Sequence, residues 1–256
     1  MSSGPSLPRE HQRMTTRQQE WLALALLSAL ATAGFELWPQ LDQIVSGWFF
    51  EQGRFDGSQW VWPKVLFHGM PLLGGALSAA ALLTIAARAL GHALGKRWVG
   101  ARRTRQAIFF LGLVVVGVGV VAHDVLKNNW GRARPMDVQA FGGSKVYTAP
   151  LEPSDQCSRN CSFVSGHAAG GFALMALGML GSRRRRWRWW AAGLLLGSLV
   201  GLARLVEGRH FLGDVVFAGL MIWLVCLLLR EVVIRLKARR MRKTGSCEQR
   251  LQAPTG

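Results

Sequence analysis

The chain has 256 residues, of which 50% are hydrophobic and 18% are charged, and it contains 11 Trp but a single Tyr. This length suits one substantial domain, but the composition is too apolar for an ordinary soluble protein. A formal net charge of +17 could indicate nucleic-acid binding, so the placement of the 31 Lys and Arg residues decides between a basic binding face and the ends of membrane helices.

Six apolar runs are long enough to cross about 30 Å of hydrocarbon as helices, which takes about 20 residues. In chain order they cover residues 21–38, 64–90, 106–126, 164–182, 189–206 and 211–231. The first run has no clear small-residue cleavage site after it, so we expect an uncleaved anchor and not a signal peptide. The sequence therefore predicts an all-α, polytopic membrane protein with six transmembrane helices.

The basic residues lie between these runs, in four blocks that six spans would place on one side of the membrane. Lys and Arg concentrate in short cytoplasmic loops, so we expect both termini in the cytoplasm. The opposite side then holds residues 39–62, 127–163 and 207–210. The block "RRRRWR" is explained as an interfacial anchor with aromatic neighbours, and nucleic acid is not an expected partner.

We expect three parts along the chain: a cytoplasmic tail over residues 1–20, a six-span domain over 21–231 and a basic cytoplasmic tail over 232–256. The external loop 127–163 is rich in Gly, Pro and Ser, which is typical of an ordered cap or substrate collar with little regular structure.

Two cysteines, Cys157 and Cys161, lie together in this external loop. An oxidising compartment would allow a small disulfide between them, which is the interpretation we prefer. The alternative is half of a metal site, but a second ligand pair of suitable spacing is missing from the sequence.

Most of the unusual chemistry is found at the external ends of the predicted spans, in the stretches "KNNWGRARP", "CSFVSGHAAGGF" and "ARLVEGRHFLGD". The residues that stand out in them are Lys127, Arg132, Arg134, Ser165, Gly166, His167, Arg204, His210 and Asp214. Although the stretches are far apart in sequence, the six-span topology places all three at the same membrane surface. We therefore expect them to form one site.

The residue types in these stretches suit a phosphate. Several Arg and Lys side chains repel one another in a low dielectric, so their gathering is favourable with an anionic partner, and guanidinium groups match phosphate oxygens in pairs. Ser165 and Gly166 stand at a helix start, where backbone N–H groups point outward, Gly allows close approach and Ser can act as a cap and a hydroxyl donor.

His210 and Asp214 are four residues apart, which on a helix places them on one face. The carboxylate can then accept from one ring nitrogen and leave the other lone pair free, so that the imidazole acts as a nucleophile or a base. Taken singly, these features have simpler explanations: an interfacial His, Arg side chains that reach to the surface, or small residues that pack helices. Their combination, in order and on one side, favours a shared site.

Together, "KNNWGRARP", "SFVSGH" and "RLVEGRHFLGD" resemble, in internal spacing and in order, the three motifs of the type 2 phosphatidic acid phosphatase superfamily. The likeness extends from Lys127 to Asp214. The membrane branch of this superfamily has six helices and removes phosphate from lipids without a metal. The resemblance therefore implies a metal-independent phosphatase of a membrane lipid, with no cofactor.

The resemblance also implies a role for each matching residue. His210 would attack phosphorus, Asp214 would orient His210, and His167 would protonate the leaving oxygen and later activate water. The phosphoryl oxygens would be held by Lys127, Arg134, Ser165, Gly166 and Arg204.

This sequence departs from the family pattern at two positions. Val164 stands where the family usually has Pro, which costs some rigidity at the helix start. Ala203 stands where Ser usually precedes the Arg of the third motif, which removes a hydroxyl contact. Neither change abolishes a catalytic role.

The residues predict a substrate that is a lipid with a terminal phosphate or pyrophosphate, at the periplasmic face of a bacterial inner membrane. They do not distinguish the two groups, because both would be bound by the same cationic side chains. The loop before "NCSFVSGH" resembles that of bacterial lipid A phosphatases and phosphotransferases, so lipid A ranks ahead of undecaprenyl pyrophosphate and phosphatidylglycerol phosphate. A lipid phosphotransferase would use the same His210 intermediate. A non-catalytic anion-binding membrane protein would not need Asp214 one turn after His210. Both alternatives stay open.

Overall fold

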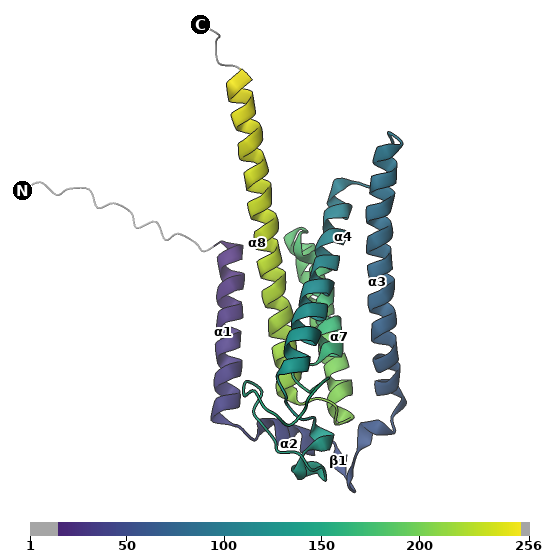
Figure 1. Cartoon of the computed structure of the whole chain (residues 1–256), viewed down its shortest axis with the longest axis vertical. Helices are drawn as coiled ribbons and strands as arrows, with labels where there is room; N and C mark the ends of the chain where they lie inside the picture. Colours follow the sequence, from purple (N-terminus) through teal and green to yellow (C-terminus); the bar gives the residue numbers. More distant parts are fainter. Residues whose placement is uncertain (1–14, 252–256) are drawn as a thin grey trace, which may run out of the picture.

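The computed structural model describes residues 15–251 and is mainly helical. Within these residues, five helical segments are long and apolar enough to cross a membrane, and they run alongside one another with α1 and α3 at opposite edges (Figure 1). They are α1 (Thr16–Leu37), α3 (Val61–Ala93), α4 (Ala101–Leu113) continued by the π-helical segment η2 (Val114–Lys127), α7 (Arg183–Val206) and α8 (Leu212–Leu251). The predicted all-α membrane architecture is confirmed.

The fourth predicted span differs from the other five. It consists of α5 (Gly166–Phe172), η5 (Ala173–Met175) and α6 (Ala176–Met179), which together contain 14 residues. At 1.5 Å per residue this segment is about 21 Å long, less than the hydrocarbon thickness of about 30 Å. The ends of the predicted run form caps instead: Ser165 caps α5 and Ser182 caps α7. Residues 15–251 thus contain five helical segments long enough to span a membrane and one shorter, largely buried helical segment.

Glycines on α7 allow this short segment and α8 to pack closely against it. Gly197 and Gly201 are one turn apart on one face of α7. A Cβ atom at Gly197 would lie 2.3 Å from the ring of Phe172, and one at Gly201 would lie 2.3 Å from Val215. Small residues permit such close backbone approach between membrane helices.

The shorter elements gather at one end of the helices (lower end in Figure 1). They are α2 (Leu41–Gly47), the antiparallel pair β1 (Phe50–Glu51) and β2 (Arg54–Phe55), and the 3-10 turns η1 (Asp56–Ser58), η3 (Pro135–Asp137) and η4 (Gln139–Phe141). Between Asn128 and Ser165 the chain is otherwise irregular, as predicted. The rings of Phe50, Phe55 and Phe141 pack together with centroids 5.1 to 5.3 Å apart, which ties the β pair to η4.

Ion pairs connect α1, α7 and α8 towards the other end. Glu20 pairs with Arg230 and, at 3.3 Å, with Arg186, while Arg17 pairs with Glu231. Helix α8 continues to Leu251, so the predicted tail over 232–256 begins as an extension of the last helix. Residues 1–14 and 252–256 of the two predicted tails lie outside the described residues.

Candidate active site

The structure brings the three unusual stretches to one end of the helices. Lys127 is the last residue of η2, and Gly166 is the first residue of α5. Arg204 lies in the last turn of α7, and His210 lies in the turn before α8 begins at Leu212. Consecutive helices run in opposite directions, so these ends meet where α2 and β1 lie (Figure 1).

His210 and Asp214 are both buried, with 2% and 0% of their surface exposed. Nδ1 of His210 lies 3.5 Å from Oδ2 of Asp214, so the imidazole faces the carboxylate at a distance longer than a normal hydrogen bond. The spacing of His210 and Asp214 had suggested that both lie on one helix, but His210 lies in the turn before α8. The two side chains still face each other, as expected. Burial lowers the pKa of His210 to about 3, and the charges of Lys127 and Arg204 act in the same direction. The ring is therefore neutral at physiological pH, with a lone pair available.

Asp214 is held by three donors besides facing His210. Arg132 donates from Nη1 to Oδ1 at 2.5 Å, and the backbone N–H of Phe211 donates to Oδ2 at 2.8 Å. The hydroxyl of Ser162 also donates to Oδ2. These contacts fix both carboxylate oxygens. The sequence did not indicate Ser162, because its contact depends on how the external loop returns to the helix ends.

Arg132 is fully buried and joins Asp214 to a second carboxylate, that of Asp42 in α2. Nη2 of Arg132 donates to Asp42 at 2.6 Å, and its Nε donates to the carbonyl of Thr148 at 2.9 Å. Its guanidinium also lies 4.5 Å from the ring centroid of Phe211. Burial opposes the charge on Arg132, but the two carboxylates raise its pKa above the usual value.

Asp42 was missed by the sequence analysis, and no motif surrounds it. Its other oxygen accepts the backbone N–H of Gly213 at 2.7 Å, so Asp42 also binds the first turn of α8. The carboxylate is 0% exposed. Burial raises the pKa of Asp42, whereas Arg132 acts against this rise.

Two cations, Lys127 and Arg204, act on His210 through their charge, and a third, Arg134, lies near these two. Lys127 and Arg204 are 5% and 7% exposed, and Arg134 donates from Nη2 to the carbonyl of Asn160 at 2.7 Å. Burial and the neighbouring charge of Arg209 lower the pKa of Arg134. In the described part of the chain, only Arg204 among these three cations forms an ion pair, with Glu207. The arrangement leaves cationic donors available for an anion.

His167 and Arg204 share one aromatic neighbour, Phe67 of α3. The ring of His167 stacks on Phe67 with centroids 4.7 Å apart, and the guanidinium of Arg204 lies 4.6 Å from the same centroid. A Cβ atom at Gly166 would lie 2.8 Å from Nε2 of His123, so a third histidine, which the sequence analysis had not singled out, closely approaches the start of α5.

Ser165 forms the cap that its sequence context predicts. Its hydroxyl accepts from the backbone N–H of Ala168 at 3.5 Å. Its own backbone N–H donates to the carbonyl of Asp214 at 3.1 Å, so the start of α5 is bound to the start of α8.

An apolar cavity of about 300 Å³ opens beside His123 and His167. Its other walls come from α3, α4, η2, α5 and η5, and include Met70, Leu77, Phe110, Val114 and Leu174. The cavity thus extends from the two histidines along apolar helix faces.

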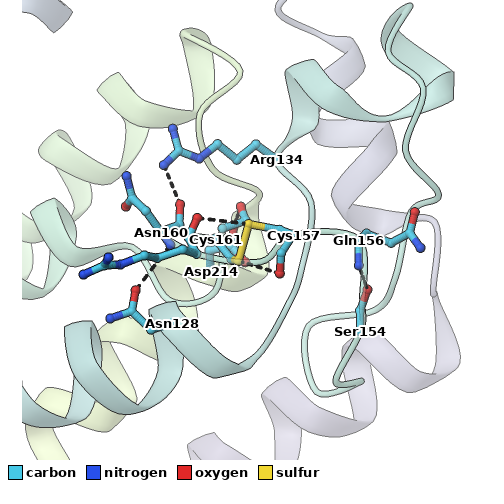
Figure 2. The surroundings of a disulfide bond; sticks show 10 residues. Asn128, Arg134, Ser154, Gln156, Cys157, Asn160, Cys161 and Asp214 are labelled. Atoms are coloured by element: carbon cyan, nitrogen blue, oxygen red, sulfur yellow. Dashed lines mark hydrogen bonds between the residues drawn. A yellow bond between two sulfur atoms is a disulfide. The ribbon is translucent and has the colours of Figure 1, made fainter.

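A disulfide joins Cys157 to Cys161 in the external loop (Figure 2). Asn160, between them, has a left-handed backbone with φ +53° and presents the carbonyl that Arg134 binds. Its backbone N–H donates to the side chain of Asn128 at 3.3 Å, and the N–H of Cys161 donates to the carbonyl of Lys127 at 2.8 Å. The disulfide loop therefore contacts the segments that carry two of the three cations.

Over residues 15–251, no group of three or more His, Cys, Asp or Glu side chains is arranged to hold a metal ion. The positions predicted to bind phosphate carry the cations Lys127, Arg134 and Arg204 and the start of α5 at Ser165 and Gly166.

Comparison with known proteins gives matches over the same region. Residues 107–237 match the PAP2 superfamily. The chain is 40% identical over 122 residues to the lipid A 4'-phosphatase of Francisella tularensis subsp. novicida, a match that covers 47% of this chain and 55% of that protein. It is 33% identical over 120 residues to the lipid A 4'-phosphatase of Rhizobium leguminosarum, with 47% and 52% covered. The chain thus spans about half the length of these curated relatives. No solved structure matches it.

The matched segment includes every residue of the three unusual stretches, from Lys127 to Asp214, and it covers about half of the chain. It also contains the helix ends that meet at the candidate site. The chain belongs to the PAP2 superfamily.

Proposed function

We propose that the protein is a membrane lipid phosphatase that releases a terminal phosphate through a phosphohistidine at His210. The observation that carries this proposal is the state of His210: a buried, neutral imidazole that faces Asp214 on one side and experiences the charges of Lys127 and Arg204, with Arg134 near these two cations. A purely structural histidine does not need a cluster of cations beside it. A nucleophile that attacks an anionic phosphate does.

The proposed reaction has two steps. In the first, the free ring nitrogen of His210 attacks phosphorus, the bond between phosphorus and the lipid oxygen breaks, and His167 gives its proton to that oxygen. In the second, His167 takes a proton from water, whose oxygen attacks the phosphohistidine and releases inorganic phosphate and His210. Asp214 stabilises the positive charge that the His210 ring acquires, and Lys127, Arg134 and Arg204 hold the phosphoryl oxygens with the N–H groups near Ser165 and Gly166.

Two observations support a lipid as the substrate. The apolar cavity beside His167 offers a place for an acyl chain next to the reacting phosphate. The helices around it are long and apolar enough to lie in a bilayer. The names of the two relatives make lipid A the first substrate to test, ahead of undecaprenyl pyrophosphate and phosphatidylglycerol phosphate.

The test uses protein purified in detergent and incubated with these three lipids in excess EDTA, followed by assay of inorganic phosphate and by mass spectrometry of the lipid. We expect phosphate release from lipid A with EDTA present, because the proposed phosphate site consists of the cations Lys127, Arg134 and Arg204 and uses no divalent ion. Activity that disappears with EDTA and returns with magnesium would overturn the metal-free mechanism. Transfer of the group to another acceptor, without free phosphate, would identify a phosphotransferase.

Two histidine variants separate catalysis from simple anion binding. His210→Gln should lower phosphate release by about 10⁴-fold or more, because it removes the nucleophile. His92→Gln is the matched control, because His92 is exposed in the last turn of α3. A His210→Gln protein that elutes like the wild type and still turns over lipid would contradict the phosphohistidine mechanism.

We further propose that the site faces the periplasm of a bacterial inner membrane, since the basic blocks lie at the opposite ends of the spans. A cysteine placed at Ser144, in a background without the four native cysteines, should react with a membrane-impermeant thiol reagent supplied from the periplasm. A cysteine at Arg97, between α3 and α4, should react only after the inner membrane is broken. The reverse pattern would place the site in the cytoplasm.

A further inference from the structure

A second pocket, of about 380 Å³, lies beside the candidate active site and has a different lining from the apolar cavity. We call it the cationic pocket. Three basic side chains line it: Arg54 from β2, Lys64 from α3 and Arg209 from the turn before α8. Its apolar wall is formed by Phe50, Phe55 and Phe141, the rings that pack on one another.

The basic groups of this pocket lack negative partners. In the part of the chain that the structure describes, Arg54, Lys64 and Arg209 form no ion pair, and the carboxylate of Glu207 in the same lining is paired with Arg204. Lys64 is also the fourth residue of α3, where a positive charge is unfavourable next to the positive end of the helix dipole. Like charges gathered in this way favour an anionic ligand.

The cationic pocket adjoins the proposed phosphate site. Glu207 lines the pocket and pairs with Arg204, which is one of the residues proposed to hold the substrate phosphate. Arg209 directly precedes His210, and its charge lowers the pKa of Arg134. A ligand in the pocket would therefore lie next to the substrate phosphate, which points to another part of the same substrate molecule.

We propose that the cationic pocket binds a second phosphate group, carried by the headgroup of the same lipid whose other phosphate is attacked by His210. This inference rests on the proposed function. Two guanidinium groups and an ammonium group can pair with the several oxygens and up to two negative charges of a phosphate monoester. A single carboxylate has fewer oxygens and one negative charge, so it would not need three cationic groups. Arg54 and Lys64 precede residue 107, so these two groups lie outside the segment that matches the PAP2 superfamily.

The first experiment compares two substrates: lipid A with two phosphates and lipid A with the 4'-phosphate alone. The measured quantity is the ratio of kcat/KM for the first to kcat/KM for the second. We expect a wild-type ratio of about ten or more, which falls towards one in the triple variant Arg54→Gln, Lys64→Gln, Arg209→Gln, because charge-assisted contacts of this kind contribute about tenfold in affinity.

The matched control removes three charges elsewhere, as Lys96→Gln, Arg97→Gln and Lys145→Gln, all at exposed positions outside the pocket. The control should keep the wild-type ratio. A triple variant with the wild-type ratio, or a wild-type protein without preference for the bisphosphorylated lipid, would overturn the proposal. If the triple variant does not fold, Lys64→Gln alone should lower the ratio by about threefold, since one of the three cations is lost.

A binding measurement separates this proposal from the proposed function. His210→Gln protein is mixed with equal amounts of the two lipids, and bound lipid is quantified by native mass spectrometry. We expect an excess of the bisphosphorylated lipid that disappears when the three pocket substitutions are added. If the wild type hydrolyses neither lipid, the proposed function fails, and the presence or absence of this excess still decides whether the pocket binds a second phosphate.

Discussion

Asp42 and Asp214 bind the same guanidinium group, that of Arg132, with oxygen to nitrogen distances of 2.6 and 2.5 Å. All three side chains are 0% exposed. A buried arginine between two carboxylates keeps each of them in place, and one of the two faces His210. We therefore expect the position of the proposed nucleophile to depend on Asp42 of α2, through Arg132 and Asp214.

Removing Asp42 should weaken both the fold and the site. In Asp42→Ala, Nη2 of Arg132 and the N–H of Gly213 lose their acceptor, and breaking a buried ion pair in this way costs about 3–5 kcal/mol. We expect a lower Tm in detergent and a lower kcat, with a smaller effect on KM. Glu51→Ala, at an exposed position, serves as the control. Wild-type Tm and kcat in Asp42→Ala would show that the shared guanidinium has no such role.

The stability of the protein should depend on His210 in mild acid. The pKa of His210 is about 3 in the folded chain, against about 6.5 in an unfolded one. Between these values the unfolded chain binds a proton that the folded chain does not, so the free energy of unfolding falls by about 1.4 kcal/mol for each pH unit below 6.5. Above pH 6.5 the ring is neutral in both states, and this contribution is constant.

Unfolding curves of wild type and His210→Gln at pH 7.5, 6 and 5 check this expectation. The wild type should lose more stability on acidification than the variant, which lacks the titrating ring. Parallel losses in the two proteins would mean that the buried imidazole is not the group that takes up the proton.

His167 can be tested through the leaving group. If His167 protonates the leaving oxygen, His167→Ala should lower the rate on lipid by about 10²-fold or more, and should lower it much less on an activated aryl phosphate, whose leaving group needs no acid. Both rates come from the same phosphate assay. Equal losses on the two substrates would assign His167 to another role, such as phosphate binding.

The disulfide should affect substrate binding more than overall stability. It closes a loop of few residues, but it holds Asn160, whose carbonyl binds Arg134. In Cys157→Ser, Cys161→Ser we expect a KM raised about threefold to tenfold, because Arg134 is less well positioned for a charge-assisted contact. Cys247→Ser is the control. An unchanged KM would show that Arg134 is positioned without the disulfide.

Much of the fold could be predicted from hydropathy, because α1, α3 and α8 are long and apolar, and a helix in lipid must satisfy its own backbone hydrogen bonds. The fourth segment could not be delimited in this way. Gly166 to Met179 is apolar because it is buried among other helices, and hydropathy does not distinguish protein from lipid as the surroundings.

The site was predictable where topology alone brings residues together. Lys127, His167 and Arg204 stand at span ends, and alternating helix directions place these ends on one side. Asp42 was missed because its contact depends on where the short helix α2 lies, and Ser162 because its contact depends on the path of an irregular loop. Neither is revealed by a periodic pattern in the sequence. Arg132 is between two residues of the first stretch, but only the structure shows that it faces away from solvent and towards two carboxylates.

The contact of Arg132 with both Asp42 and Asp214 also limits how short a functional fragment of this chain can be. A fragment of residues 107–237 would keep all three stretches and yet leave Arg132 without the carboxylate of Asp42. It would lose Phe67 as well, the ring against which His167 and Arg204 lie. We therefore expect a unit that works alone to begin ahead of α2, far upstream of Lys127, because it must include the carboxylate of Asp42 and the ring of Phe67.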